Sequence, residues 1–396
     1  MTASDPIVIV GSARTPMGGF QGELKDATAA QLGSAAIAAA VARAGLAPDA
    51  IEEVVFGCVL PAGQGQAPAR QAALGAGLPL ATGATTVNKM CGSGMKAAML
   101  AHDLILAGSA DVAVAGGMES MTNAPYLMDR ARAGFRMGHG RVIDHMFLDG
   151  LEDAYDKGRL MGTFAEDCAE AYQFTRQAQD DYAITSLQRA QAAITDGSFA
   201  GEIVPVTVSA GKVQKEVSQD EQPLKARLDK IPTLKPAFRE GGTVTAANAS
   251  SISDGAAALV LMRRSQAEAR GLTPLAAIIG HATHAQAPNL FATAPIGALR
   301  KLSERTGWAL DDVDLFEVNE AFAVVALAAM HDLGLPHEKV NVNGGACALG
   351  HPIGASGARV LVTLLAALQK HDLKRGMATL CIGGGEATAM AIERLS

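Results

Sequence analysis

The sequence lacks most features of membrane and secreted proteins. Its longest apolar region, residues 97–118, is interrupted by His102 and two aspartates, which excludes a membrane span. Only five cysteines are present and none has CxxC spacing, so neither a disulfide framework nor a metal site is expected. We expect no signal or transit peptide before Ile7 and no peroxisomal address at the end of the chain. We therefore expect a cytoplasmic protein.

The chain also has only a small excess of one charge sign over the other. The 33 basic and 40 acidic residues are well mixed and give a net charge of -7, which excludes the basic footprint of a nucleic-acid binder. Hydrophobic residues make up 49% of the chain, too many for a disordered protein. With 396 residues, the chain exceeds one ordinary core and suits two or three packed units.

A reactive cysteine is indicated where a strand-like segment stops, glycines follow and an apolar helix pattern begins. Cys91 stands at that point, in the segment TVNKMCGSGMK at 86–96. The free N–H groups and the dipole of a helix N-terminus favour negative charge, so we expect the thiolate of Cys91 to form more readily there than in water. The alternative is a buried small hydrophobic residue, which is what most free cysteines are.

Two glycine-framed segments near the other end of the chain carry groups that a thiol nucleophile needs. NGGACALGHPIG at 343–354 contains His351, and CIGGGE at 381–386 begins with Cys381. A Cys/His pair far apart in sequence is typical of covalent catalysis, because the histidine accepts the thiol proton. A second cysteine suggests a second proton to be moved. The glycines let backbone N–H groups approach a substrate oxygen, as an oxyanion site requires.

Strand-like and helical segments alternate, and the same order then returns after residue 271. The first set comprises 7–10, 28–44, 54–58, 66–75, 85–88, the helix after Cys91 and 111–115; the second comprises 275–279, 295–306, 314–318, 320–333, 340–342, 354–369 and 378–382. This alternation predicts an α/β fold with a mostly parallel sheet covered on both faces. A duplicated fold would bring the two helix entries together, and with them Cys91, His351 and Cys381.

The segment between the copies is less regular and more charged. We expect an N-terminal half at 1–121, completed by 252–272, an inserted loop domain at 122–251, and a C-terminal half at 273–396. An insertion into a rigid scaffold is a natural place for substrate recognition. Individual charged residues in its polar part, 197–239, are expected to be solvated.

Taken together, these segments resemble the thiolase family, and within it the acetoacetyl-CoA thiolases. The motifs that carry the resemblance run through the whole chain: SARTP (12–16), GQAPARQ (65–71), NKMCGSGMK (88–96), GGMESM (116–121), VTAANAS (244–250), DGAA (254–257), NEAF (319–322), GHPIG (350–354) and CIGGG (381–385). The resemblance implies two βαβαβαββ halves that form a layered α-β-α-β-α core. It also implies an acetyl-CoA C-acetyltransferase that joins two acetyl-CoA molecules through an S-acetyl-cysteine, or runs the reverse thiolysis.

The resemblance assigns five residues to the chemistry. Cys91 would be the nucleophile, and His351 would activate it and, with a water held by Asn319, would stabilise the enolate oxygen. Cys381 would exchange the α-proton of acetyl-CoA, and the N–H groups of Cys91 and Gly383 would form a second oxyanion hole. On local sequence alone, Asn319 could equally be a helix N-cap.

Substrate-binding residues follow from the same resemblance. Ser250 would contact the pantetheine arm, and Met161 and Phe322 would line the acyl pocket. Leu160 stands where biosynthetic thiolases usually have histidine, and Phe291 where many have methionine, so both are expected to make this pocket apolar.

No cofactor is expected, because coenzyme A is a substrate. The sequence around Phe291 and after the triple glycine resembles mitochondrial-type enzymes, some of which bind potassium and accept a 2-methyl branch, but Pro223 stands about where that potassium site has a tyrosine. The expected partners are acetyl-CoA, acetoacetyl-CoA and CoA, with assembly as a homodimer or homotetramer.

Three alternatives remain at the level of sequence. A degradative 3-ketoacyl-CoA thiolase of broader chain length would use the same residues. A ketoacyl synthase would normally have histidine in the role of Asn319 or Cys381, and a non-catalytic acyl-CoA-binding relative should have lost a member of the Cys91, His351 and Cys381 set.

Overall fold

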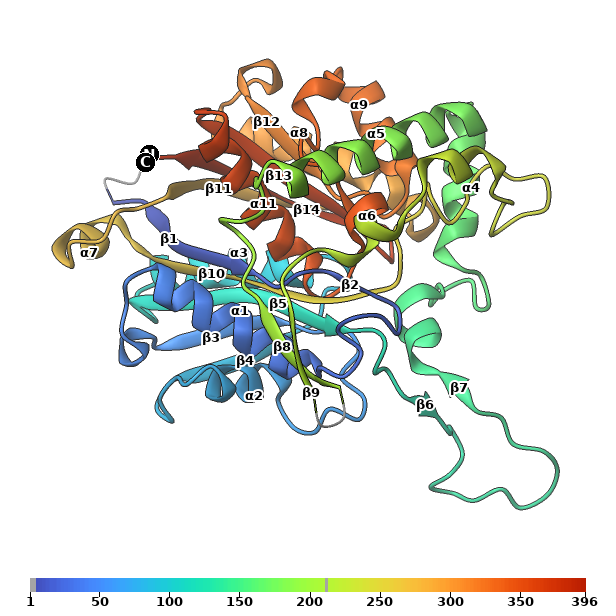
Figure 1. The fold of residues 1–396 in the computed structure, drawn as a ribbon, viewed down its shortest axis with the longest axis horizontal. Helices are drawn as coiled ribbons and strands as arrows, with labels where there is room; N and C mark the ends of the chain where they lie inside the picture. Colours follow the sequence, from blue (N-terminus) through green and yellow to red (C-terminus); the bar gives the residue numbers. More distant parts are fainter. Residues whose placement is uncertain (1–4, 211–212) are drawn as a thin grey trace.

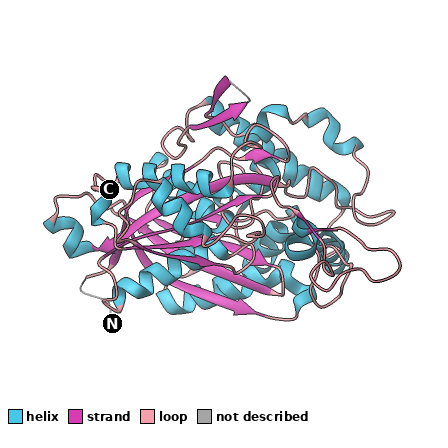
Figure 2. Cartoon of the chain, turned by 90° about the horizontal axis from the view of Figure 1, so that it is seen from below, coloured by secondary structure: helices cyan, strands magenta, loops and turns pink. Residues whose placement is uncertain are grey.

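The computed structural model describes residues 5–210 and 213–396, which form one large sheet with helices on both faces (Figure 1). The strands run through the middle of the molecule, with helices around them (Figure 2). None of the helices in these ranges has the length and apolar character needed to cross a bilayer. The first four residues, on which the expectation of no leader peptide partly rests, lie outside the described residues.

The first copy of the repeated unit has the expected order of strands and helices. Its elements are β1 (Ile7–Arg14), α1 (Ala29–Arg43), β3 (Glu53–Gly57), α2 (Pro68–Gly75), β4 (Gly83–Val87), α3 (Ser93–Leu106), β5 (Val112–Ser120) and β10 (Ser253–Arg263), with the short β2 (Gly18–Gly19) and η1 (Pro48–Ala50). Helix α1 begins with a capping box in which Thr28 and Gln31 satisfy each other's backbone N–H groups.

The second copy follows after α7 (Arg264–Ala269). Its elements are β11 (Ala276–Ala285), η4 (Pro288–Thr293), α8 (Ala294–Thr306), η5 (Leu310–Asp312), β12 (Leu315–Val318), α9 (Ala323–Leu333), η6 (His337–Lys339), α10 (Ala346–Leu349), α11 (Ser356–Lys370), β13 (Arg375–Ile382) and β14 (Glu386–Arg394). The strand expected at 340–342 does not form: only Val340 makes an isolated parallel bridge, to Phe316. The side-chain amide of Asn341 instead accepts the N–H of Val318 and donates to its carbonyl, so these backbone groups are not available for strand pairing.

The sheet is less parallel than predicted. Its order is β12-β13-β14-β11-β1-β10-β5-β3-β4, and only the pairs β12–β13, β3–β5 and β3–β4 are parallel. The last strand of each copy, β10 or β14, runs antiparallel to both of its neighbours. The prediction was wrong for β14 because only residues 383–385 separate it from β13, too few for the crossover that parallel pairing requires, and β10 enters the sheet from the insertion.

The two halves of this sheet, one from each copy, lie on either side of α3 and α11, so the molecule has the five layers that the resemblance implied. α1 and α2 cover the outer face of the first copy, and α8 and α9 cover that of the second. Between the two copies, α3 and α11 pack against each other and against strands of both. Gly94 and Gly357 permit this contact, because a Cβ on either would lie only 2.7 or 2.3 Å from a backbone nitrogen of the other helix.

The insertion contributes its own elements and one buried ion-pair cluster. It contains β6 (Tyr126–Leu127), β7 (Ile143–Asp144), η2 (Phe147–Leu151), α4 (Met161–Ala171), α5 (Arg176–Thr195), β8 (Val206–Ala210), β9 (Val213–Val217), α6 (Glu221–Lys225) and η3 (Leu228–Thr233). The charged residues of its polar part were expected to be solvated, but some of them are buried. Glu202 and Asp220 are buried and both pair with Arg14 of β1, Asp220 through two bonds of 2.7 and 2.9 Å. Since a buried charge is costly without a partner, this cluster fixes the insertion to the core.

Candidate active site

The turn that carries Cys91 lies between β4 and α3, as the sequence predicted. The hydroxyl of Ser93 donates to the carbonyl of Met90 at 2.6 Å and accepts from the N–H of Lys89 at 2.8 Å. These bonds hold Met90 at φ +47°, a conformation that non-glycine residues rarely adopt. A Cβ at Gly92 would lie 2.3 Å from the Ile382 side chain, so the turn from the first copy can reach the second only with glycine there.

The Cys91 thiol is not activated in the way that its position suggested. Burial raises its pKa to about 11, against the opposing effect of hydrogen bonds from the N–H of Gly383 and from its own N–H. The charge of Glu119 raises the pKa further. The expectation of an easily formed thiolate is therefore wrong for the free enzyme: Cys91 precedes the helix N-cap, Gly92, and loss of solvation outweighs the backbone donors. A base must remove the proton.

We expect His351 to be that base, because its ring is neutral and one ring nitrogen is without a partner among the described residues. Its Nδ1 lies 2.5 Å from the Ser356 hydroxyl, which also donates to the carbonyl of Pro352 at 3.0 Å. Because the hydroxyl has one hydrogen, its oxygen accepts from Nδ1–H, and Nε2 keeps its lone pair. Nε2 has no hydrogen-bond partner within the described ranges. Burial, followed by the charge of Arg359, lowers the pKa of His351 to about 3, so the ring is neutral.

Asn319 follows β12 and is fixed by a buried ion pair. Arg359 of α11 bonds to Glu317 and to the Asn319 Oδ1, each at 3.3 Å. This leaves Nδ2 of Asn319 as a donor without a partner among the residues that the structure describes. Helix α9 begins only at Ala323, so the alternative reading of Asn319 as its N-cap is wrong.

Cys381 lies next to the end of β13 and is 1% exposed. Burial raises its pKa well above the ordinary value, and the nearby Cys91 raises it further. The two thiols are therefore close enough to interact, although they come from different copies. Cys381 belongs to the same apolar cluster as Phe291 and Phe322, and Met161 packs against this cluster.

Three of the four residues expected to line the acyl pocket, Met161, Phe291 and Phe322, lie in or against that cluster. The ring centroid of Phe322 lies 6.3 Å from that of Phe291, in an edge-on arrangement. A Cβ at Gly383 would lie 3.6 Å from the Met161 sulfur, so α4 of the insertion faces the turn that reaches Cys91. Leu160 is the half-buried N-cap residue of α4, and its backbone bridges to Glu152. That these side chains limit the substrate stays a prediction.

Ser250 lies in a loop that joins the insertion to the catalytic segments. Its N–H donates to the carbonyl of Ala321 at 2.9 Å, and the neighbouring Ala249 bridges to Phe322. The next residue, Ser251, accepts the N–H of His351 at 3.2 Å. These contacts place Ser250 beside the NEAF segment and the His351 turn, where a bound substrate could pass.

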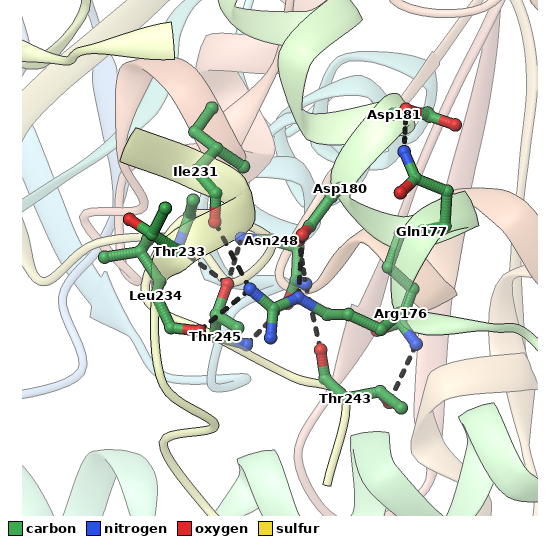
Figure 3. A network of polar contacts seen from close by, with 12 residues as sticks. Arg176, Gln177, Asp180, Asp181, Ile231, Thr233, Leu234, Thr243, Thr245 and Asn248 are labelled. Carbon is green, nitrogen blue, oxygen red and sulfur yellow. Dashed lines mark hydrogen bonds and ion pairs between the residues drawn. The ribbon is translucent and has the colours of Figure 1, made fainter. Parts of the chain in front are cut away.

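A polar network holds this loop in place (Figure 3). Asn248 donates to Asp180 of α5 at 3.0 Å and accepts the N–H of Thr245 at 2.7 Å. Asp180 also accepts from Arg176, which donates to the backbone of η3 at 3.2 Å. Residues far apart in the insertion therefore fix the loop that lies beside the His351 turn.

Three residues of the site were not singled out from the sequence. Ser356 holds His351, Arg359 holds Asn319, and Glu119 accepts the N–H groups of Val59 at 2.9 Å and Gly354 at 2.9 Å. Glu119 thereby ties the end of β5 to the segment after His351, and burial raises its pKa to about 7. Only Glu119 lies within one of the motifs, GGMESM, whereas Ser356 and Arg359 lie beyond GHPIG in α11, so their spatial partners alone give them a role.

Comparisons with known proteins agree with this geometry. The model of the thiolase N-terminal domain matches residues 7–265, and that of the thiolase C-terminal domain matches 272–394. The chain belongs to the thiolase family. This confirms the resemblance, the fold class and the expectation of an acyltransferase.

Relatives match this thiolase over almost its whole length. Acetyl-CoA acetyltransferase 2 of Arabidopsis thaliana is 54% identical over 393 residues, which cover 98% of this chain and 97% of the relative. The acetyl-CoA acetyltransferase of Cupriavidus necator is 48% identical, with coverage of 98% and 99%. The crystal structure of the Bacillus anthracis acetyl-CoA acetyltransferase matches all of both chains with a TM-score of 0.96 at 41% identity.

Proposed function

We propose that this thiolase is an acetyl-CoA C-acetyltransferase, which condenses two acetyl-CoA molecules to acetoacetyl-CoA and CoA and also runs the reverse thiolysis. The observation that carries the proposal is that groups from both copies lie together at the Cys91 sulfur. Gly383 of the second copy donates its N–H to Cys91 of the first. The His351 ring, also from the second copy, is neutral, and its Nε2 carries a lone pair that can accept a proton. The names of the relatives support acetyl-CoA as the substrate.

The first half-reaction forms the acyl-enzyme. The Cys91 sulfur attacks the thioester carbon of acetyl-CoA as its proton passes to His351, and the bond to the CoA sulfur breaks. The departing thiolate needs a proton, which Cys381 supplies, so that this residue is left as a thiolate. The N–H groups of Cys91 and Gly383 would hold the oxyanion, an interaction worth about 3 kcal/mol per donor.

The second half-reaction forms the carbon–carbon bond. The Cys381 thiolate takes the α-proton of a second acetyl-CoA, and its enolate oxygen is stabilised by His351 together with a water held by Nδ2 of Asn319. The enolate carbon then attacks the acetyl group on Cys91. The Cys91 sulfur leaves and regains the proton from His351, so both cysteines return to their starting state.

Substrate length separates this proposal from a degradative 3-ketoacyl-CoA thiolase. We expect acetoacetyl-CoA to have the highest kcat/KM, a 2-methyl branch to be tolerated, and six-carbon or longer substrates to fall at least about tenfold, which corresponds to about 1.4 kcal/mol. Phe291→Ala should relax this limit by enlarging the apolar cluster beside Cys381. Thiolysis rates across chain lengths test this, and a preference of the unmodified enzyme for eight-carbon substrates would favour the degradative alternative. A non-catalytic relative is disfavoured because all three central residues are present.

Two exposed features support assembly as a homodimer or homotetramer. Strand β4 lies at one end of the sheet, with a free hydrogen-bonding edge in the described part of the chain. An arm that includes β6 and β7 extends from the body (Figure 1) and exposes large apolar side chains, among them Tyr126, Met128, Met137 and Val142. Light scattering of the purified enzyme would count the copies, and a monomer would contradict the assembly.

A reducing compartment such as the cytoplasm suits this enzyme, because all five cysteines are free thiols and two of them are placed in the chemistry.

A further inference from the structure

Outside the acyl-transfer site, two histidines and an aspartate from opposite copies meet at the surface. His102 and Asp103 lie in α3 of the first copy, and His281 lies in β11 of the second. Asp103 Oδ1 is 3.0 Å from Nδ1 of His102 and 3.0 Å from Nε2 of His281. The two imidazole rings are perpendicular, with centroids 5.1 Å apart.

We propose that His102, Asp103 and His281 bind one divalent transition-metal ion of the zinc class. The three ligand atoms lie within 4.8 Å of one another. A tetrahedral ion with bonds of ~2.0–2.1 Å needs ligand atoms about 3.3 Å apart, so small side-chain movements would suffice to admit it. Two imidazoles and one carboxylate suit zinc, whereas a hard ion such as magnesium prefers oxygen donors.

Exposure at the cluster also suits a metal with an open coordination position. The side chains of His102 and His281 are only 13% and 16% exposed, whereas that of Asp103 is 51% exposed. Packing therefore fixes the two rings, while the carboxylate side stays accessible to the ion and to a water as fourth ligand. The guanidinium of Arg305 donates to the backbone carbonyl of His281 at 2.8 Å and so supports this part of β11.

The chain contains a matched pair that lacks the third ligand. His331 and Asp332 are also consecutive, with Nδ1 and Oδ1 2.9 Å apart, and the His331 side chain is 67% exposed. Across residues 5–210 and 213–396, no other group of three or more His, Cys, Asp or Glu side chains brings its ligand atoms as close together as the His102 cluster. The sequence could not reveal the site, because Asp103 and His281 are separated by 178 positions and have no motif spacing.

A bound ion would join the two copies. Since α3 and β11 belong to different copies, an ion that binds only when both are in place stabilises the folded chain by mass action. The site is distinct from Cys91 and Cys381, and zinc there would act on stability.

Calorimetric titration of the full-length protein with Zn²⁺ tests the proposal, with thermal unfolding at the same zinc concentrations. We expect one ion per chain and a rise in the unfolding temperature. His281→Gln and Asp103→Asn, on different elements, should each weaken binding at least tenfold and remove the temperature rise. His331→Gln, the matched control, should bind as the unmodified chain does, and so should Cys91→Ser, which controls for binding at the active-site thiols. Undiminished binding in both cluster variants, or binding lost only in Cys91→Ser, would overturn the proposal.

Discussion

The two copies of the repeated unit enter their central helices through similar turns but use them for different tasks. Both α3 and α11 begin with a serine. In the first copy, the Ser93 hydroxyl bonds only to the backbone of its own turn and shapes the loop that presents Cys91. In the second copy, Ser356 bonds to a side chain, His351, whose Nε2 has no partner in the part of the chain that the structure describes. In the proposed mechanism, one serine therefore positions the nucleophile and the other positions the base.

The strand ends differ in the same way. β5 continues through Ser120, and its Glu119 is buried as an acceptor for backbone N–H groups. β13 stops at Ile382, and a glycine turn then brings the N–H of Gly383 to Cys91. At this point the first copy supplies a carboxyl that holds backbone segments in place, and the second supplies a backbone N–H beside Cys91. Duplication thus gives two copies with equivalent backbone folds, and a few hydrogen bonds decide what each copy contributes to the site.

The largest expected effect comes from the sulfur that the second copy contributes. Cys381→Ser should still form acyl-enzyme at Cys91, although more slowly because the leaving CoA thiolate loses its proton donor. It should exchange the α-protons of acetyl-CoA at least about a thousandfold more slowly, because a hydroxyl is a far weaker acid than a thiol. Proton exchange followed by NMR in deuterated buffer, together with intact mass spectrometry, separates the two steps.

Cys168→Ser is the matched control, since Cys168 is buried in the same apolar cluster. It should leave both steps almost unchanged. If Cys381→Ser abolishes acylation while exchange stays normal, the roles of the two cysteines are reversed.

A smaller effect should separate the two serines. Ser356→Ala removes the acceptor for Nδ1–H of His351, so both acylation and α-proton exchange should slow by about tenfold, the equivalent of one hydrogen bond of about 1.4 kcal/mol. Ser93→Ala should slow acylation but leave exchange near its normal rate, because it alters only the Cys91 turn. Rapid-quench measurement of acylation and NMR measurement of exchange compare the variants. Equal effects of both substitutions on both steps would break the distinction between the copies.

The smallest effect concerns stability and Glu119. Burial raises the pKa of this carboxyl from 4.5 to about 7, so the folded chain holds its proton more tightly than the unfolded chain does. The stability that protonated Glu119 contributes is therefore present below pH 4.5 and is lost as the pH rises to about 7. Urea unfolding between pH 4 and 8 should show this fall, and Glu119→Gln should reduce it. A variant with the same pH dependence as the unmodified chain would contradict the buried-carboxylate account.

Much of the fold could be predicted because the hydrophobic periodicity of the segments, and the glycines and prolines between them, identify the strands and helices. The repeat of strands and helices and the entry to α3 follow directly from the sequence. The antiparallel course of β10 and β14 does not, since a strand pattern carries no information about its direction in the sheet. Val340–Val342 has strand-like residues, but the Asn341 amide takes up neighbouring backbone groups and prevents the ladder from forming.

The site shows a similar division between local and spatial information. Cys91, His351 and Cys381 stand in glycine-framed segments, and the structure brings their turns together. The pKa of Cys91 was misjudged because a local pattern shows the helix entry but does not show burial by the second copy. Arg359 and Ser356 lie on the buried face of α11, where the sequence alone gives no reason to separate them from core residues.

The central claim is that Cys91 of the first copy is the nucleophile that the second copy activates. Brief exposure of the enzyme to acetyl-CoA, followed by proteolysis and mass spectrometry, tests it most directly. The account predicts one acetyl group per chain, on the peptide that contains Cys91, and none on Cys381. It also predicts that Cys91→Ser loses the label and nearly all turnover. An acetyl group on another residue, or full activity in Cys91→Ser, would contradict the account.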